Sequence, residues 1–135
     1  MAKSWAQKLN NGAKPVVEVT DKAFAGIPAG AKMLIPTPVL VKEYMEKLPR
    51  GKTATIDQVR EDLAKEYNAE FTCPLTTGIF VRIVAEAALD EHRLGADLSE
   101  ITPFWRVLDA RSKAGKKLSC GTDFLTEMRK DEAGS

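Results

Sequence analysis

The stretch TIDQVREDLAKEYNAEFTCPLTTGIFVRIVAEAALD, from Thr55 to Asp90, contains two helical patterns separated by a short connector. In the first pattern Thr55 or Asp57 can cap the helix, and apolar residues recur at helical spacing. The second pattern, from about Leu75 to Asp90, has a broad apolar face that predicts a deeply buried helix. Two helices joined by a short connector are typical of a helix-turn-helix.

The sequence before this stretch predicts one more helix and an extension. In PTPVLVKEYMEKL, Thr37 occupies an N-cap position and Pro38 the first helical position, and the helix should end at Pro49. Residues 1–35 are rich in Gly, Ala and Lys and contain one strand-like run, PVVEV. We therefore expect residues 1–35 to form a partly flexible N-terminal extension, and residues 36–135 to form the folded domain.

The sequence after this stretch suggests a hairpin and a closing helix. Residues 105–110 are expected to form a first strand, SKAGKK its turn, and Leu118 with its neighbours a returning strand. Phe124, Leu125 and Met128 then mark the apolar face of a last helix. The predicted fold is α+β and mainly α: a winged helix-turn-helix with a small wing hairpin and a C-terminal helix.

Three motifs in this order support that fold by resemblance: LPRGKTAT at Leu48 to Thr55, TPFWRVL at Thr102 to Leu108, and FLTEMRKDEAG at Phe124 to Gly134. From about Pro36 to Gly134 the chain resembles the winged-helix domain of DNA alkyltransferases, the methylated-DNA–protein-cysteine methyltransferases. It is most similar to their cysteine-free relatives, the alkyltransferase-like proteins. This resemblance implies double-stranded DNA, possibly alkylated, as the partner, and a role in DNA repair.

The chain departs from the alkyltransferase pattern at the residues that carry the chemistry. The catalytic cysteine position of the family holds Phe104, and the adjoining histidine position holds Trp105. The Tyr that helps those families to rotate a nucleotide is replaced by Ile56. The resemblance therefore implies a non-enzymatic protein that recognises modified guanine without repairing it. Phe104, Trp105 and Arg106 would line or block the base pocket, and the alternative is that the two aromatic residues pack in the core.

Candidate DNA contacts lie on the second helix of the pair and in the expected wing. Thr76, Thr77 and Arg82 can contact phosphate or base edges. The basic cluster RSKAGKK supplies four further candidates, Arg111, Lys113, Lys116 and Lys117. The alternatives are a purely structural helix and a solvated turn.

Composition limits the other classes of function. The 135 residues carry a formal net charge of +1, so any DNA affinity must come from local basic patches. No apolar run suits a membrane span or a secretory signal, and a cytoplasmic protein is expected. The two cysteines, Cys73 and Cys120, form no disulfide framework and no metal set, so no cofactor is predicted.

Two other functions remain open. Cys73 precedes a helix and could act as the nucleophile of a thiol-dependent enzyme, although the single histidine, His92, lies far along the same helix. A winged-helix protein-interaction module without DNA binding fits the near-neutral charge equally well.

Overall fold

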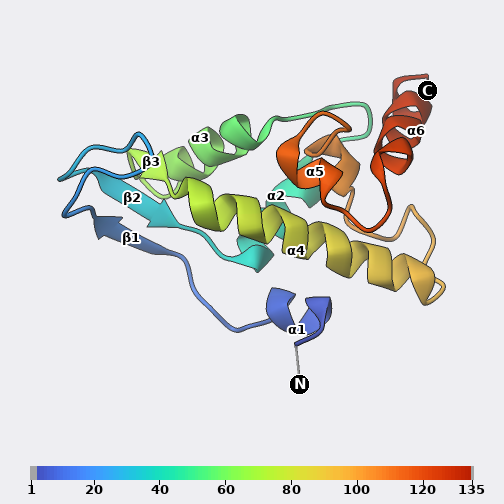
Figure 1. The fold of residues 1–135 in the computed structure, drawn as a ribbon, viewed down its shortest axis with the longest axis horizontal. Coiled ribbons are helices and arrows are strands. Elements are labelled where there is room, and N and C mark those ends of the chain that lie inside the picture. Colours follow the sequence, from blue (N-terminus) through green and yellow to red (C-terminus); the bar gives the residue numbers. More distant parts are fainter. Residues whose placement is uncertain (1–2, 135) are drawn as a thin grey trace.

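The protein has an α+β fold that is mainly helical, with one small sheet (Figure 1). The computed structural model describes residues 3–134. The elements in chain order are α1 (Trp5–Leu9), β1 (Val16–Val19), β2 (Lys32–Ile35), α2 (Pro38–Lys47), α3 (Ile56–Glu66), β3 (Phe71–Thr72), α4 (Pro74–Arg93), the 3-10 helix η1 (Phe104–Arg106), α5 (Lys113–Lys116) and α6 (Thr122–Ala133).

Helix α4 is the centre of the structure, as its broad apolar face predicts. It contacts α1, α2, α3, α5 and η1, and the other helices surround it in Figure 1. Val81, Val84, Ala85 and Leu89 are all buried on this helix. Burying one Val or Leu side chain contributes about 1.5–3 kcal/mol to the stability of the folded state. The buried face of α4 is therefore a large part of the core.

The predicted helix starts are confirmed by their capping contacts. The hydroxyl of Thr37 accepts a hydrogen bond from the amide of Leu40 at 3.1 Å. The hydroxyl of Thr55 accepts one from the amide of Gln58, also at 3.1 Å. Each cap satisfies an amide that has no partner within its helix, which fixes where α2 and α3 begin.

The sheet joins the N-terminal segment to the rest of the chain. β1 pairs with β2 in antiparallel orientation, with Val17 opposite Leu34. β2 pairs with β3 in parallel orientation, with Leu34 opposite Thr72. Leu34 and Leu9 are both buried in the main core cluster. Residues from the 1–35 segment therefore supply two of the three strands and part of the core.

The wing hairpin expected over residues 105–118 is wrong, because this segment contains two short helices and turns but no strand. Trp105 lies in η1, and SKAGKK contains α5 rather than a turn between strands. The cause is local hydrogen bonding around Ser112. Its hydroxyl accepts the amide of Gly115 at 3.0 Å and donates to the carbonyl of Asp109 at 2.8 Å. The Asp109 carboxylate accepts the amides of Arg111 and Ser112, so backbone groups that a strand would pair are already satisfied.

Within residues 3–134, no helix combines the length and the apolar character needed to cross a membrane.

Candidate nucleic-acid interface

A groove of about 700 Å³ runs beside the N-terminal half of α4, and we call it the α4 groove. Four helices contribute to its walls: α1, α3, α4 and α5. Its uncharged lining consists of Trp5, Ile56, Pro74, Leu75, Gly78, Ile79, Ile83 and Ala114. Its charged lining consists of Lys8, Arg82, Lys113 and Lys117.

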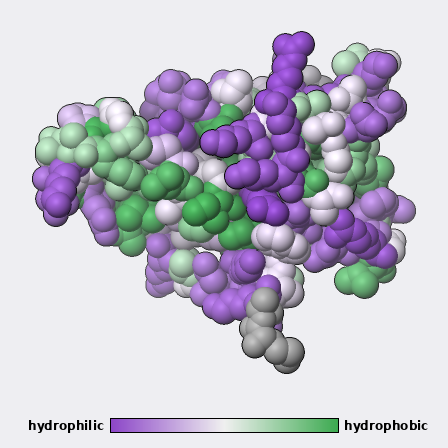
Figure 2. Space-filling model, in the orientation of Figure 1, coloured by the Kyte–Doolittle hydropathy of each residue, from purple (hydrophilic) through white to green (hydrophobic). Residues whose placement is uncertain are grey.

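The floor of the α4 groove is apolar and open to solvent. Leu75 is 61% exposed and Ile79 is 57% exposed. They lie four residues apart on α4 and therefore share one face of the helix. Figure 2 shows hydrophobic surface over this part of α4, with hydrophilic surface on either side, over α5 and over α1.

The charged lining of the α4 groove is entirely basic. None of its lining residues in the described part of the chain is an aspartate or a glutamate. The Nε atom of Arg82 is buried and has no hydrogen-bond partner. The guanidinium carbon of Arg82 lies 5.5 Å from the ring centroid of Trp5, and the Lys8 ammonium lies 4.4 Å from the same centroid. The groove thus offers an apolar floor and positive charge to a partner.

Three of the predicted DNA contacts meet at this groove. Arg82 from α4 and Lys113 and Lys117 from the α5 segment all line it. Lys116 is exposed on α5 but is not part of the groove lining. Arg111 is also exposed and borders a separate hollow of about 330 Å³ that contains Asp57 and Asp109.

The two threonines of α4 are placed differently from each other. Thr76 is half-buried near the start of the helix. Thr77 is fully buried, and its hydroxyl donates a 2.6 Å hydrogen bond to the carbonyl of Cys73. The expectation that Thr77 contacts DNA is therefore wrong for this conformation. Thr77 lies four residues before the buried Val81 and therefore on the face of α4 that packs against the core.

The aromatic pair of the TPFWRVL motif belongs to the core. Phe104 has no exposed surface and Trp105 is 3% exposed. Their rings meet edge to face with centroids 5.2 Å apart, and Phe124 stacks on Phe104 at 5.9 Å. The core-packing interpretation of the two aromatics is confirmed.

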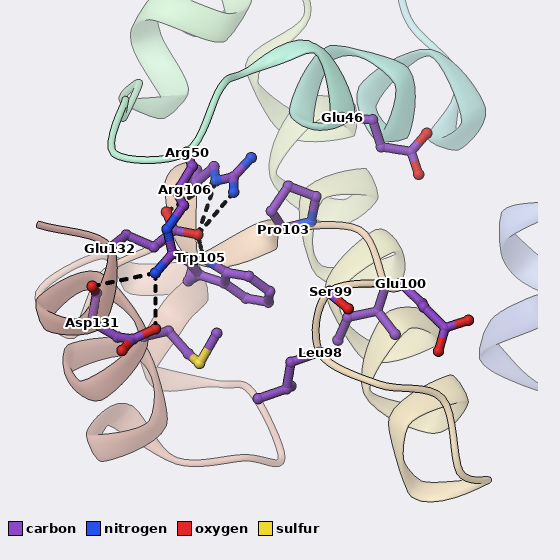
Figure 3. Close-up of a pocket in the computed structure, with 12 residues that line it drawn as sticks. Glu46, Arg50, Leu98, Ser99, Glu100, Pro103, Trp105, Arg106, Asp131 and Glu132 are labelled. Carbon is purple, nitrogen blue, oxygen red and sulfur yellow. Dashed lines mark hydrogen bonds and ion pairs between the residues drawn. The ribbon is translucent and has the colours of Figure 1, made fainter. Parts of the chain in front are cut away.

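Arg106 and Glu132 form a buried ion pair next to Trp105 (Figure 3). Arg106 Nη2 lies 2.9 Å from Glu132 Oε2, and Arg106 Nε donates to Oε1 at 3.0 Å. The indole Nε1 of Trp105 donates to Glu132 Oε2 at 2.8 Å, and Arg106 Nη1 donates to the Leu48 carbonyl at 2.6 Å. Arg106, which the resemblance places at the base pocket, is thus the partner of the Glu132 carboxylate.

The pKa of Glu132 reflects this environment. Burial alone would raise it, but hydrogen bonds from Arg106, Trp105 and the Gly51 amide, together with the charge of Arg106, hold the pKa below its usual value. Glu132 is therefore ionised in the folded protein at neutral pH. Through these contacts the Glu132 carboxylate links α6 to η1 and to the loop after α2.

A hollow of about 570 Å³ adjoins this ion pair. Trp105 and Met128 form part of its apolar wall, and the ion pair of Arg50 with Asp131, at 3.2 Å, lies at its side (Figure 3). Glu46 and Glu100 also line it. The hollow carries charges of both signs, in contrast to the α4 groove.

The thiol-dependent alternative has no arrangement to support it in residues 3–134. Cys73 is buried with Ile27, Ala31 and Met33 in a second apolar cluster. His92 lies near the other end of α4, and the rise of an α-helix places it roughly 28 Å from Cys73. The Nδ1 atom of His92 lies 2.9 Å from the Ala96 carbonyl oxygen. Burial raises the pKa of the Cys120 thiol, which disfavours its thiolate. Nor does any group of three or more His, Cys, Asp or Glu in these residues suit a metal ion.

The lining residues of the α4 groove that come from α1, Trp5 and Lys8, were missed from the sequence. A local signal for this helix exists, because Ser4 and Gln7 form a reciprocal capping box. The contact of α1 with α4 has no such local signal, since it joins segments about 70 residues apart.

Comparison of the chain with protein-family models, with curated proteins and with solved structures finds no match. The function proposed below therefore rests on the geometry and charge of these residues and on the motif resemblance.

Proposed function

We propose that this chain is a non-enzymatic DNA-binding protein that contacts duplex DNA through the α4 groove and α5. The main supporting observation is that Arg82 of α4 and two lysines of the distant α5 segment, Lys113 and Lys117, line one groove, and that no carboxylate of residues 3–134 lines it. Lys and Arg side chains that neutralise phosphates supply most of the affinity of non-specific DNA binding. In this proposal α3 and α4 act as a helix-turn-helix with α4 on the DNA.

A net charge of +1 is compatible with this function because the effect is local. At physiological ionic strength the Debye length is about 8 Å, so charges on the opposite side of the molecule are screened from the α4 groove. The basic lining therefore decides the attraction of a phosphate to this surface.

The proposed lesion, alkylated guanine, rests on the resemblance of TPFWRVL to the alkyltransferase motif. In this chain the position of the reactive cysteine is the fully buried Phe104. A chain without a thiol at that position would leave unrepaired any modified duplex that it binds. This supports recognition rather than repair as the role of the chain.

The decisive experiment is fluorescence anisotropy with a labelled duplex, with and without one O6-methylguanine, across about 50–200 mM salt. We expect binding that weakens steeply with salt, and tighter binding of the modified duplex. The combined variant Lys113→Glu, Lys116→Glu, Lys117→Glu should lose binding. The matched control, Lys22→Glu, Lys47→Glu, Lys65→Glu, makes the same change in net charge at exposed lysines outside the groove and should retain it.

Each outcome bears on a separate part of the proposal. Equal loss in both triple variants would mean that net charge, not the groove, drives binding. Equal affinity for the two duplexes would reject lesion recognition while leaving DNA binding in place. No binding of either duplex at the lowest salt would reject the DNA-binding function.

A second candidate function is binding of an acidic protein segment. The observation that favours it is the exposure of Leu75 and Ile79 between the cations of the groove. An amphipathic helix with Leu on one face and Glu beside it would complement this surface. Such a labelled peptide should bind the wild type and not a Leu75→Glu, Ile79→Glu variant. Failure of that peptide to bind would remove this candidate.

A further inference from the structure

We propose that helix α1 is part of the DNA contact surface, with Lys8 contacting the phosphate backbone and Trp5 positioning Lys8 and Arg82. This inference rests on the proposed DNA-binding function and extends it to a segment outside the region that resembles alkyltransferases. Trp5 is a positioning residue, because it acts through the two cations.

Helix α1 is anchored to the rest of the domain. Its first turn is fixed locally, because the Ser4 amide donates to the Gln7 side chain at 2.8 Å and the Gln7 amide donates to the Ser4 hydroxyl at 3.1 Å. Leu9 at its end is buried in the main core cluster, and the helix lies alongside α4 in Figure 1. Lys8 is therefore held at the groove rather than on a free chain end.

Trp5 brings two cations to one aromatic ring. The Lys8 ammonium and the Arg82 guanidinium carbon lie 4.4 Å and 5.5 Å from its centroid. The electron-rich face of an indole attracts both cations, and holding them there opposes their mutual repulsion. Two cations at one ring, with no carboxylate of residues 3–134 in the groove lining, favour an anion beside them.

The position of α1 relative to α5 indicates the kind of anion. Lys113 and Lys117 border the groove from the α5 segment, and Lys8 borders it from α1. Figure 2 shows hydrophilic surface over both segments, with the apolar surface of α4 between them. A polyanion that crosses the groove meets cations at both ends, whereas a single small anion engages one end only. A nucleic-acid backbone, with phosphates at regular intervals, meets both sets of cations.

The test uses the full chain and the duplex anisotropy assay described above. Lys8→Gln should reduce the slope of log affinity against log salt by about 0.9, the value for one phosphate contact. Its matched control, Lys14→Gln, removes an exposed lysine of the same N-terminal segment that does not line the groove. That control should leave the slope unchanged.

Trp5 is tested by a pair of variants. Trp5→Leu keeps an apolar side chain but removes the aromatic face, and should weaken binding about two- to fivefold, the effect of an exposed cation–π contact. Trp5→Phe restores an aromatic ring and should recover most of the affinity. The salt slope should stay constant in both, because no charge is lost. A purely structural α1 would lower thermal stability in these variants without distinguishing Leu from Phe in DNA affinity.

The outcomes separate this inference from the proposed function. Wild-type binding with unchanged slope in Lys8→Gln and unchanged affinity in Trp5→Leu would overturn the role of α1 and leave the α4–α5 surface intact. No duplex binding by the wild type at about 50 mM salt would overturn both.

Discussion

Removing one partner of the ion pair between Glu132 and Arg106 should strongly destabilise the protein. Glu132 is 5% exposed and Arg106 15% exposed as side chains, so neither is well solvated in the folded state. Glu132→Ala would remove the carboxylate from the Arg106 guanidinium and leave its hydrogen bond to the Leu48 carbonyl. It would also leave the buried indole N–H of Trp105 without its acceptor.

The expected size of this effect follows from the cost of a buried unpaired charge. Breaking a buried pair by removing one partner costs about 3–5 kcal/mol. Since a domain of this kind is stable by about 5–15 kcal/mol, Glu132→Ala should remove a large part of the total free energy of unfolding. Glu132→Gln keeps an oxygen acceptor for Trp105 but removes the charge, and its loss should be smaller. Glu127→Ala, at an exposed position of α6, should change stability by less than about 0.5 kcal/mol.

The pH dependence of this loss provides a second check. The pKa of Glu132 is lowered in the folded state, so its contribution is fully present above the unfolded-state pKa of about 4.3. The contribution is lost as the pH falls through the lower, folded-state value. The difference in stability between wild type and Glu132→Ala should therefore shrink as the pH is lowered from 7 toward about 3.

Urea unfolding followed by circular dichroism and tryptophan fluorescence measures both effects. The free energies of unfolding of wild type, Glu132→Ala, Glu132→Gln and Glu127→Ala are compared at neutral and acidic pH. A Glu132→Ala loss below about 1 kcal/mol at neutral pH would refute the reasoning, because it would fall in the range of exposed ion pairs.

The remaining predictions concern packing and thiol chemistry. Gly115→Ala should destabilise the protein by about 1–3 kcal/mol, because a Cβ atom there would collide with the Asp109 carbonyl and lie 2.5 Å from the Ser112 hydroxyl oxygen. Gly78→Ala, whose Cβ would meet no atom within 4 Å, should instead stabilise α4 by about 0.5–1 kcal/mol; thermal unfolding compares the two, and a loss in both would contradict the packing argument. Toward a thiol reagent, the half-buried Cys120 should react before the buried Cys73, and faster labelling of Cys73 would reopen the thiol-enzyme alternative. Mass spectrometry after incubation with O6-methylguanine DNA should find no methyl group on either cysteine, and a methylated cysteine would contradict a non-enzymatic role.

The sequence predicted well those features that depend on neighbouring residues. The starts of α2 and α3 follow from Thr37 and Thr55, whose hydroxyls cap amides three residues away. The apolar spacing of α4 predicted its burial for the same reason, because helical periodicity is a local property. The hairpin around Ser112 was predicted from its Gly and Lys residues, but competing local hydrogen bonds from Asp109 and Ser112 close a helical turn there.

By itself, the sequence determined α2, α3, α4 and α6, the caps of α2 and α3, and the absence of a thiol and a histidine in TPFWRVL. Only the tertiary structure decided that β2 pairs with β3. These two strands are parallel, so Leu34 and Thr72 are brought together by a long connection through α2 and α3 rather than by a tight turn. It also decided that Lys8 and Trp5 join Arg82, Lys113 and Lys117 at one groove. Periodicity and capping report on interactions within about one helical turn, whereas these contacts depend on how the apolar faces of separate helices bury one another.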